Sequence, residues 1–445
     1  MSVSDIALRA KQAFQRLSST DGDSRNGFIR RVRENLIEKR EVILSENALD
    51  LEEAKLSVAS GDLSSSLFSR LDLSGSKFDS VLSGLKSLEG LPDPLGSITY
   101  SQQMAEGLSL YRLTCAIGVV AVIFESRPEA AIQIASLCLK SGNAVILKGG
   151  REASRSNKAL IDCIRSALPD ELVDAVQGVE SREAIGQLLG MDKLVDLIIP
   201  RGSADLVRHI KKNTLIPVLG HADGICHTYV HENADIHKAL AILIDAKTQY
   251  PAVCNATEVL LVDEQLAGTF LPLAAEALVQ KGVTLKLDDR AFDIIGIESP
   301  LIMKAVTSDF DTEWCDLTLS IGVVQSIEIA IEHINKHGSH HTDAIVTENQ
   351  RAADVFMTKV ESAGVYWNAS TRFADGFRYG FGAEVGVSTG KLHARGPMGL
   401  EGLITYKYRL YGNGHTLADY GKQLEAIHVP VTSDHINKVH MKLYS

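Results

Sequence analysis

Between Ile117 and Gly150 the chain reads IGVVAVIFESRPEAAIQIASLCLKSGNAVILKGG, and this stretch is the strongest evidence for a fold class. Ile117–Phe124 is an apolar run of strand length, and Pro128 is the residue type favoured in the first turn of a helix. A second apolar run, Ala144–Gly149, follows at the spacing of a strand–helix–strand unit. Runs that are apolar throughout predict strands buried on both faces, so we expect a parallel sheet covered by helices.

The same alternation continues on the C-terminal side. A helix is predicted over Ala153–Leu168, and strands are predicted at Asp174–Val179 and Val195–Pro200. A second strand–helix series begins near His221 and runs to about Thr371. The chain has 445 residues, enough for roughly three domains. The predicted class is therefore α/β, with two doubly wound parallel-sheet domains.

The two ends of the chain differ from this pattern. The first hundred residues have helical spacing, and Ser4 is the expected N-cap of the first helix. Ser57–Gly90 is rich in serine and glycine, but its leucines keep a period that favours short helices over a linker. The last segment, Asn413–Ser445, is polar and has no assigned role.

Composition excludes several classes of protein. The net charge is −11 without a sustained basic block, which argues against a nucleic-acid partner. The longest apolar run, Ala116–Phe124, is too short to span a bilayer, so no membrane association is expected. The 6 cysteines include no CxxC pair, which indicates free thiols in a reducing compartment. A cytoplasmic location is the default expectation.

Two strand ends could bind the anionic part of a ligand. The predicted strand before Arg201 leads into Gly202 and Ser203, and Ser203 is placed to cap the next helix. Free backbone N–H groups and the helix dipole make such a turn an anion site, although an ordinary capped turn has the same sequence. The other strand end carries Lys148, Gly149 and Arg151, which could hold ribose hydroxyls or phosphate or could form a solvated loop.

One cysteine stands out as a candidate nucleophile. Cys254 lies in the turn-like segment QYPAVCNATE, where backbone N–H groups could stabilise a thiolate or an oxyanion and Asn255 offers an amide donor. Cys226 also lies in a turn-like setting and remains an alternative. The other four cysteines are expected to be structural: Cys115, Cys138, Cys163 and Cys315.

The histidine-rich segment EHINKHGSHH (Glu332–His341) suggests a metal site at first sight. His333 and His337 are four residues apart on a predicted helix, but no carboxylate or cysteine completes a ligand set. Histidines near a helix C-terminus also suit the helix dipole. We therefore assign no metal site.

Seven segments, in order, resemble the gamma-glutamyl phosphate reductase (glutamate-5-semialdehyde dehydrogenase) family of the aldehyde dehydrogenase superfamily. The same module forms the reductase half of delta-1-pyrroline-5-carboxylate synthase. The resemblance covers about Ile6–Tyr411. The segments are FESRPEAAIQIASL (Phe124–Leu137), GNAVILKGGREASRSN (Gly142–Asn157), IPRGSADLV (Ile199–Val207), VLGHADGICH (Val218–His227), DAKTQYPAVCNATEVLLVD (Asp245–Asp263), VYWNASTRFADGFRYGFGAEVGVST (Val365–Thr389) and LHARGPMGLEGL (Leu392–Leu403).

The resemblance implies an aldehyde dehydrogenase-like architecture. The cofactor-binding domain would comprise 1–98 and 113–220, and the catalytic domain 221–395. A β-ribbon oligomerisation arm would comprise 99–112 and 396–415, and 416–445 would be a tail of unknown role. The chain is therefore expected to form a homo-oligomer. It contains no amino-kinase segment, so a separate glutamate 5-kinase is the expected source of its substrate.

The resemblance also implies a reaction in proline biosynthesis. NADPH would reduce L-glutamyl 5-phosphate to L-glutamate 5-semialdehyde and phosphate through a Cys254 thioester. The expected oxyanion donors are the Cys254 backbone N–H and a group near Ser126, which occupies the place of the superfamily's oxyanion asparagine. Glu313 resembles the glutamate that holds the nicotinamide ribose. Three arginines are candidates for binding the phosphate and carboxylate of the substrate: Arg127, Arg372 and Arg395.

Two competing functions follow from the same segments. A hydrolytic aldehyde dehydrogenase would need a glutamate base, but Val218 occupies that place in IPVLGHADG. A catalytically silent oligomeric scaffold would not need the intact Cys254 segment. Reduction of an acyl phosphate is therefore the favoured function, and a steady-state assay would distinguish it from the scaffold.

Overall fold

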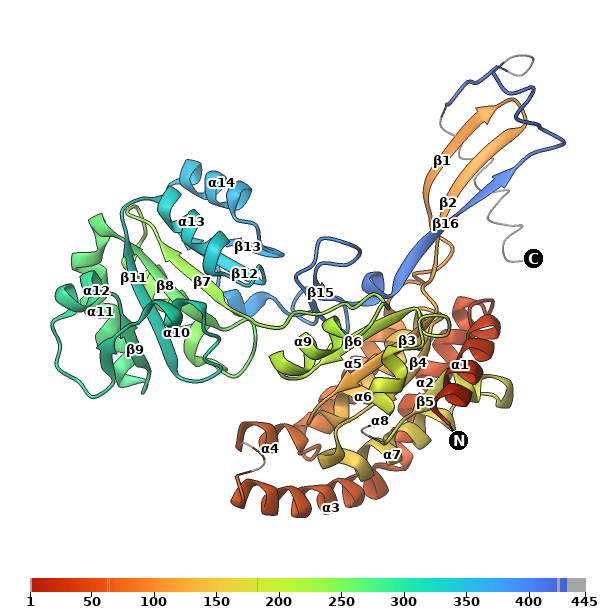
Figure 1. The fold of residues 1–445 in the computed structure, drawn as a ribbon, viewed down its shortest axis with the longest axis horizontal. Coiled ribbons are helices and arrows are strands. Elements are labelled where there is room, and N and C mark those ends of the chain that lie inside the picture. Colours follow the sequence, from red (N-terminus) through yellow and green to blue (C-terminus); the bar gives the residue numbers. More distant parts are fainter. Residues whose placement is uncertain (1, 62, 64, 182, 422–424, 430–445) are drawn as a thin grey trace. The chain divides into compact units, whose positions relative to one another are not determined.

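The computed structural model describes residues 2–61, 63, 65–181, 183–421 and 425–429. These residues form two compact units (Figure 1). The first unit comprises the described residues of 1–202, 209–218 and 399–445, and the second comprises 203–208 and 219–398. The second unit is thus inserted into the sequence of the first, and each is described here by itself.

The first unit contains the parallel sheet expected from the apolar runs. Its strands are β3 (Val119–Phe124), β4 (Ala144–Lys148), β5 (Val176–Gly178) and β6 (Leu197–Arg201), in the order β5-β4-β3-β6. All residues of β3 and β4 are buried, which explains why these strands do not alternate with polar residues. The strand order reverses between β3 and β6, and open α/β sheets bind ligands beyond the carboxyl ends of their strands at such a point.

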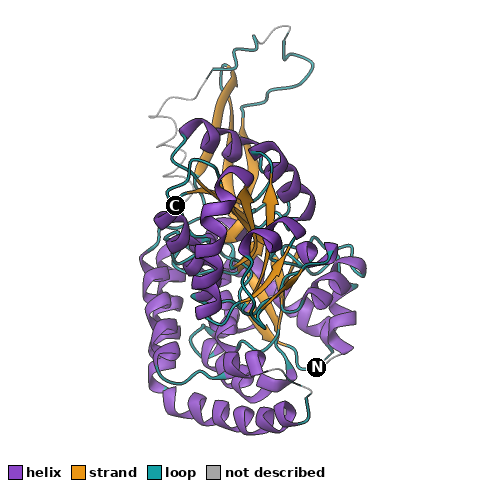
Figure 2. Ribbon diagram, turned by 90° about the vertical axis from the view of Figure 1, so that its left-hand side faces the viewer, coloured by secondary structure: helices purple, strands orange, loops and turns teal. Residues whose placement is uncertain are grey.

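Helices form most of the rest of the first unit (Figure 2). They are α1 (Val3–Leu17), α2 (Gly22–Glu38), α3 (Arg40–Ala59), α4 (Ser65–Leu71), α5 (Ser76–Gly90), α6 (Pro128–Lys140), α7 (Ser154–Arg165) and α8 (Glu183–Leu189). Helix α9 (Ala204–Lys212) is divided between the two units. Helix α6 begins at Pro128 as predicted. The N-cap prediction for α1 was wrong by two residues, because Ser2 accepts from Asp5 N and forms a capping box with it.

The first unit also carries an antiparallel three-stranded sheet. Its strands are β1 (Ile98–Ala105), β2 (Leu108–Ala116) and β16 (Ile404–Tyr411), in the order β1-β2-β16. In Figures 1 and 2 the free end of this sheet lies away from the helices of its own unit. Large side chains of β16 are exposed, among them Tyr406 and Leu410.

The second unit is built on a seven-stranded parallel sheet with the order β10-β9-β11-β8-β7-β12-β13. Its strands are β7 (Cys226–Val230), β8 (Thr257–Asp263), β9 (Thr284–Leu287), β10 (Ile302–Lys304), β11 (Thr318–Val324), β12 (Thr342–Val346) and β13 (Gly364–Trp367). Its helices are α10 (Ile236–Thr248), α11 (Glu264–Gln280), α12 (Asp289–Ile295), α13 (Ile327–His337) and α14 (Gln350–Lys359). A short antiparallel pair, β14 (Gly386–Ser388) and β15 (Gly396–Met398), follows.

Strand β8 shows why these strands are apolar on both faces. Leu260 and Val262 pack in a cluster with residues of α10, α11 and α12. Val259 and Leu261 pack in a second cluster with residues of α13 and α14. Successive side chains of a strand point to opposite faces, so both faces of this sheet are covered by helices. The α/β class with doubly wound parallel sheets is confirmed.

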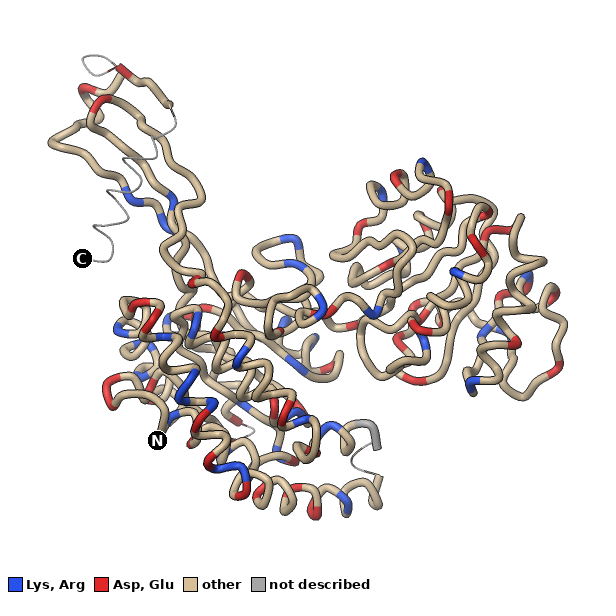
Figure 3. The backbone as a smooth tube through the Cα atoms, turned by 180° about the vertical axis from the view of Figure 1, so that it is seen from behind, with Lys and Arg blue, Asp and Glu red and all other residues tan. Residues whose placement is uncertain are grey.

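The charge distribution agrees with the composition. Acidic and basic residues are interspersed along the backbone of each unit (Figure 3). Within the described ranges, no helix combines the length and the apolar character needed to cross a membrane.

Candidate active site

Neighbouring strands of the second unit bring three reactive side chains together at one edge of the sheet. His221 lies five residues before β7, Cys254 three residues before β8 and His341 directly before β12. These strands are adjacent and parallel, so the loops that precede them meet at the amino edge. One donor atom from each of the three side chains lies within 4.8 Å of the other two.

The electrostatics of this group favour a thiolate at Cys254. Burial alone would raise the pKa of the Cys254 thiol, but the adjacent His341 and His221 outweigh burial and lower this pKa well below its ordinary value. Burial also opposes protonation of His221, yet the Cys254 thiolate and the Val387 carbonyl raise the pKa of His221 to about 9. The two shifts together favour a thiolate at Cys254 beside an imidazolium at His221.

Close backbone contact fixes the position of Cys254. A Cβ placed on Gly224 would lie 2.4 Å from the Cys254 carbonyl oxygen and 2.5 Å from its Cα, so only glycine permits this approach. Cys226 is fully buried and donates its thiol to the Cys254 carbonyl oxygen at 3.2 Å. Burial raises the pKa of Cys226 well above its ordinary value. Of the two cysteines in turn-like segments, Cys254 thus has the environment of a nucleophile.

Glu313 is a second predicted site residue that lies beside Cys254. It precedes β11, the strand adjacent to β8 on the side opposite β7. Burial and the Cys254 thiolate raise the pKa of Glu313, while the Gly224 N–H opposes this shift. The loop that contains Glu313 is held to β8 by Glu258, whose carboxylate accepts from Cys315 N at 3.3 Å.

Glu258 forms a fully buried ion pair with Lys247 of α10, at 2.5 Å. Burial raises the pKa of Glu258 to about 8, against the opposing effect of Lys247. The pair ties α10 to β8 on either side of the Cys254 loop. Removing one partner would leave an uncompensated buried charge, so this pair is a structural support of the site.

Arg372 is buried beside Cys254 without an acidic partner. It follows β13, and its guanidinium donates to the Gln249 side-chain oxygen at 2.9 and 3.0 Å and to Asn255 Oδ1. Asn255 Nδ2 in turn donates to the Ala374 carbonyl oxygen at 2.8 Å. Arg372 makes no ion pair with a carboxylate in the described part of the chain. A buried guanidinium whose hydrogen bonds go to neutral amides could bind an anion without breaking an ion pair.

The remaining predicted catalytic and substrate residues are divided between the two units. Ser126 and Arg127 belong to the first unit, and Ser126 donates its N–H and its hydroxyl to Glu152 at 2.6 and 2.9 Å. Arg395 is in the second unit, where it pairs with Glu361 at 2.9 Å. The structure therefore brings Cys254, Asn255, Glu313 and Arg372 together, but it does not place Arg395 among them.

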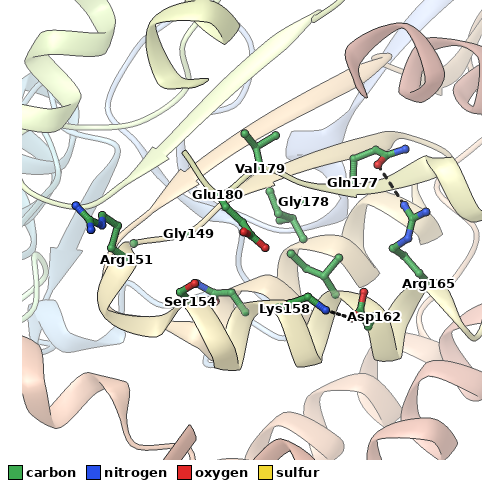
Figure 4. A pocket seen from close by; sticks show the side chains of 14 residues that line it. Gly149, Arg151, Ser154, Lys158, Asp162, Arg165, Gln177, Gly178, Val179 and Glu180 are labelled. Atoms are coloured by element: carbon green, nitrogen blue, oxygen red, sulfur yellow. Dashed lines mark hydrogen bonds and ion pairs between the residues drawn. The ribbon is translucent and has the colours of Figure 1, made fainter. Parts of the chain in front are cut away.

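The first unit contains a pocket of about 440 Å³ at the carboxyl ends of β4 and β5. Its lining residues come from these strand ends and from α7 (Figure 4). They include the predicted cofactor residues Gly149 and Arg151, and also Ser154, Lys158 and Glu180. Figure 4 shows Glu180 directed toward α7, between Arg151 and Lys158. A carboxylate that accepts from ribose hydroxyls, flanked by cations that attract phosphate, fits part of a dinucleotide.

Two groups near this pocket already have partners within the chain. Asp50 already occupies the first turn of α7, where it accepts from Ser156 N at 2.8 Å and from Ser156 Oγ at 2.6 Å. The first turn of α7 therefore already has an anionic partner, the carboxylate of Asp50. Lys148 is buried, and its ammonium donates to the Gly149 carbonyl oxygen at 2.5 Å. Burial lowers the pKa of Lys148 despite the nearby carboxylate of Glu152.

Gly202 and Ser203 follow β6 as predicted, at the carboxyl edge of the parallel sheet where the strand order reverses. Gly202 belongs to the first unit, whereas Ser203 begins the segment 203–208 of the second. Their role in binding a cofactor stays a prediction.

Sequence reasoning missed His221, His341, Gln249 and the Lys247–Glu258 pair. The sequence did single out both regions, because the second strand–helix series was predicted to begin near His221 and the histidine-rich segment includes His341, but neither residue was linked to Cys254. Parallel strands place such residues at one edge, and only the strand order was needed to bring them together. The order itself has no local sequence signature.

The histidine pair considered for a metal has a different environment. The rings of His333 and His337 lie 4.5 Å apart, and His337 Nδ1 contacts Asp311 Oδ1 at 2.7 Å. Burial, together with His227 and His337, lowers the pKa of His333 to about 3. These rings pack against one another and against Phe310.

Comparison with known proteins identifies the family. The aldehyde dehydrogenase family model matches residues 1–294. A probable gamma-glutamyl phosphate reductase of Schizosaccharomyces pombe is 49% identical over 99% of this chain and 100% of its own length. Gamma-glutamyl phosphate reductase 1 of Synechocystis is 52% identical over 94% of this chain and 95% of its own.

A solved structure agrees with the sequence relatives. The crystal structure of gamma-glutamyl phosphate reductase from Thermotoga maritima matches with a TM-score of 0.88 and 37% identity, covering 94% of this chain and 100% of that chain. Matches at this identity and coverage include both units and the three-stranded sheet. The chain therefore belongs to the gamma-glutamyl phosphate reductase family of aldehyde dehydrogenase-like oxidoreductases.

Proposed function

We propose that the chain reduces L-glutamyl 5-phosphate to L-glutamate 5-semialdehyde and inorganic phosphate with NADPH, through a thioester on Cys254, in proline biosynthesis. The single observation that carries this proposal is the thiol of Cys254, whose pKa is lowered by His341 and His221 at the amino edge of the second sheet. The relatives that share the chain's full length are named for the same reaction.

The chemistry needs a nucleophile more than it needs further activation. An acyl phosphate is already a reactive acyl donor, so a thiolate can displace phosphate and keep the acyl group as a thioester. Hydride transfer is the chemistry that a bound nicotinamide supplies. The chain's own part is to hold the acyl group on Cys254, stabilise the oxyanion and release the aldehyde, which regenerates the thiolate.

Substrate recognition in this proposal centres on Arg372. Its buried guanidinium has neutral partners, Gln249 and Asn255, and it can accept an anionic group without breaking an existing ion pair. Asn255 then acts by orienting Arg372, since its amide already donates to Ala374. The Cys254 N–H and Ser126 are the proposed oxyanion donors, and Arg127 and Arg395 remain secondary candidates for substrate charges.

The fate of the thioester distinguishes this proposal from a hydrolytic dehydrogenase. Val218 is apolar and cannot take a proton from water, and general-base help typically contributes about 10²–10⁴-fold in rate. Starting from semialdehyde and NADP, we expect steady NADPH formation only with inorganic phosphate or arsenate. Without either anion, at most about one NADPH per active site should form. Continuous phosphate-independent turnover that yields glutamate would replace this proposal with the hydrolytic one.

The proposed cofactor preference depends on the pocket of the first unit. NADPH carries an additional phosphate on its adenosine ribose, and Arg151 supplies a cation at the pocket wall. Arg151→Ala should weaken NADPH binding about tenfold or more and leave NADH binding nearly unchanged. Arg155→Ala is the matched control, because Arg155 does not line the pocket and is already paired with Glu53 at 2.5 Å. An unchanged preference in Arg151→Ala would assign the role to another residue.

Partners follow from the same proposal. A separate glutamate 5-kinase would supply the acyl phosphate in the cytoplasm. The three-stranded sheet, with Tyr406 and Leu410 exposed on β16, is the proposed oligomerisation arm of a homo-oligomer. Light scattering of wild type and of Tyr406→Lys would test this assignment.

A further inference from the structure

His221 carries a proton at the point where the proposed reaction needs one. We propose that His221 is the general acid that protonates the phosphate as it leaves the acyl group. This inference rests on the proposed Cys254 thioester and assigns the residue that makes its first step possible. Nothing in the family resemblance or in the relatives' names assigns this role.

The leaving group creates the requirement. The phosphoryl group of an acyl phosphate is a dianion near neutral pH, and it would depart as a trianion if the carbon–oxygen bond broke unaided. Such a species is a strong base and a poor leaving group. In the proposed step the Cys254 sulfur bonds to the acyl carbon, and the electrons of the breaking bond go to the bridging oxygen. That oxygen takes the proton from His221 and leaves as hydrogen phosphate.

The geometry orients the proton donor. His221 Nδ1 contacts the Val387 carbonyl oxygen of β14 at 2.8 Å, and a carbonyl can only accept, so Nδ1 carries a proton. One ring nitrogen of His221 lies within 4.8 Å of the Cys254 sulfur, and we assign Nε2 to this contact because Nδ1 is bound to the Val387 carbonyl. An acyl carbon bonded to that sulfur would bring its departing oxygen next to the same nitrogen.

The charge balance explains when the proton is released. In the resting site the thiolate stabilises the imidazolium, which raises the pKa of His221 to about 9. Forming the thioester consumes the thiolate charge, and burial then favours the neutral ring. The proton becomes acidic at the moment of phosphate departure. When the aldehyde leaves, the thiolate returns and His221 takes a proton from solvent, so one turnover consumes one proton.

The other groups that face His221 are less suited to this task. His341 is fully buried, and its Nδ1 lies 3.7 Å from Cys226 Sγ and 3.0 Å from Thr342 Oγ1. The Thr342 hydroxyl can donate as well as accept, so this contact does not fix the proton of His341 as the Val387 carbonyl fixes that of His221. Burial and the Cys254 thiolate raise the pKa of Glu313, but its carboxylate is held by the Gly224 N–H, whereas the ring of His221 directs a nitrogen to the sulfur. His341 is therefore assigned to the electrostatic support of the thiolate.

His221 has two possible roles, which are to support the Cys254 thiolate and to protonate the leaving phosphate. Three reactions of the same protein distinguish them. Alkylation of Cys254 by iodoacetamide reports the thiolate alone. Acylation by p-nitrophenyl acetate, followed by p-nitrophenolate release, adds a leaving group that departs without a proton. Reduction of L-glutamyl 5-phosphate with NADPH adds a leaving group that needs one. The variants are His221→Gln and its matched control His341→Gln.

We expect His221→Gln to slow all three reactions, because the thiolate loses a supporting charge. Relative to its own alkylation rate, its ester acylation should stay within about threefold of wild type, and its acyl-phosphate reduction should fall by a further ~10²-fold or more. For His341→Gln, the rates of ester acylation and of acyl-phosphate reduction, each divided by the alkylation rate, should change by the same factor. In wild type, kcat/KM for the acyl phosphate should decline near pH 9 as His221 loses its proton, and this decline should be absent with the ester.

The outcomes distinguish this inference from the proposed function. Equal losses of ester and acyl-phosphate reactions in His221→Gln, at matched alkylation rate, would overturn the acid role and leave the thioester intact. Retained reduction in Cys254→Ala would instead overturn the thioester itself. Circular dichroism and NADPH binding establish that each variant is folded. His221→Asn is the second variant, and it should reproduce the selective loss for acyl phosphate.

Discussion

The second unit contains two groups of histidines whose charges differ although both are largely buried. In the first, His221 lies beside the Cys254 sulfur, and its pKa is raised to about 9. In the second, His333 packs against the ring of His337, and its pKa is lowered to about 3. Burial opposes protonation of both rings. The difference comes from the neighbour, which is an anion in one group and other aromatic rings in the other.

Burial alone therefore does not determine the charge of a histidine. An anionic sulfur within hydrogen-bond reach outweighs burial, whereas neighbouring imidazoles add to it. The contrast also separates a reactive group from a packing group within one sheet. Substitutions in and around the two groups test this difference.

Cys254→Ala should have the largest effect, because it removes the anion from the first group. Turnover should fall by at least about 10⁴-fold, since a missing nucleophile is not replaced by its neighbours. Without the thiolate, burial should dominate and the pKa of His221 should fall below its wild-type value of about 9. Histidine NMR titration measures this shift directly. Cys226→Ala should keep measurable turnover, and an equal loss there would contradict the assignment of Cys254.

Arg372→Gln should have the next largest effect, because it removes the cation that has no acidic partner beside the first group. The KM for phosphate in the reverse reaction should rise about 10- to 100-fold, which is the usual range for one charge-assisted contact. Arg395→Gln is the matched control, since Arg395 already pairs with Glu361. Steady-state kinetics at saturating semialdehyde distinguishes the two. A larger effect in Arg395→Gln would assign the anion site to Arg395 instead of Arg372.

His341→Gln should make the first group more like the second by weakening the support of the thiolate. The apparent pKa of Cys254 should rise, because His341 is the largest of the influences that lower it. Iodoacetamide alkylation at neutral pH should therefore slow by roughly tenfold. The pH profile of alkylation measures the effect, and an unchanged profile would show that His221 alone holds the thiolate.

His333→Phe should have the smallest effect and should act on stability. The folded-state pKa of about 3 lies below the unfolded value near 6.5, so the unfolded chain binds the proton first as the pH falls. His333 therefore makes the folded state less stable between about pH 6.5 and pH 3, by at most about 1.4 kcal/mol per pH unit. The variant should flatten this dependence in urea denaturation without changing activity at neutral pH. A wild-type slope in the variant would assign the acid sensitivity to another group.

Much of the fold was predictable because apolar runs such as Ala144–Lys148 are long, buried and bounded by turns. The N-cap of α1 was not, because Ser2 and Ser4 are equally good caps and only the capping box with Asp5 selects the first. In the site, the turn and the family segment single out Cys254, and its role as nucleophile stays a prediction. His221 was not predictable, because its effect depends on which strands are neighbours, and strand order is a property of the whole sheet.

The interrupted sequence of the first unit has a consequence for synthesis of the chain. Strand β2 pairs with β16, whose residues follow the whole inserted segment 219–398, and Asn143 donates to the Leu403 carbonyl oxygen. β16 ends 411 − 116 = 295 residues after β2 ends, so on a ribosome that adds about 5–20 residues per second the nascent β1–β2 hairpin would wait roughly 15–60 s for its third strand. During that interval β2 presents an unpaired edge, which is a template for wrong pairing. The residues of the second unit, 203–208 and 219–398, are all synthesised before β16, so the hairpin edge of the first unit stays unpaired longest.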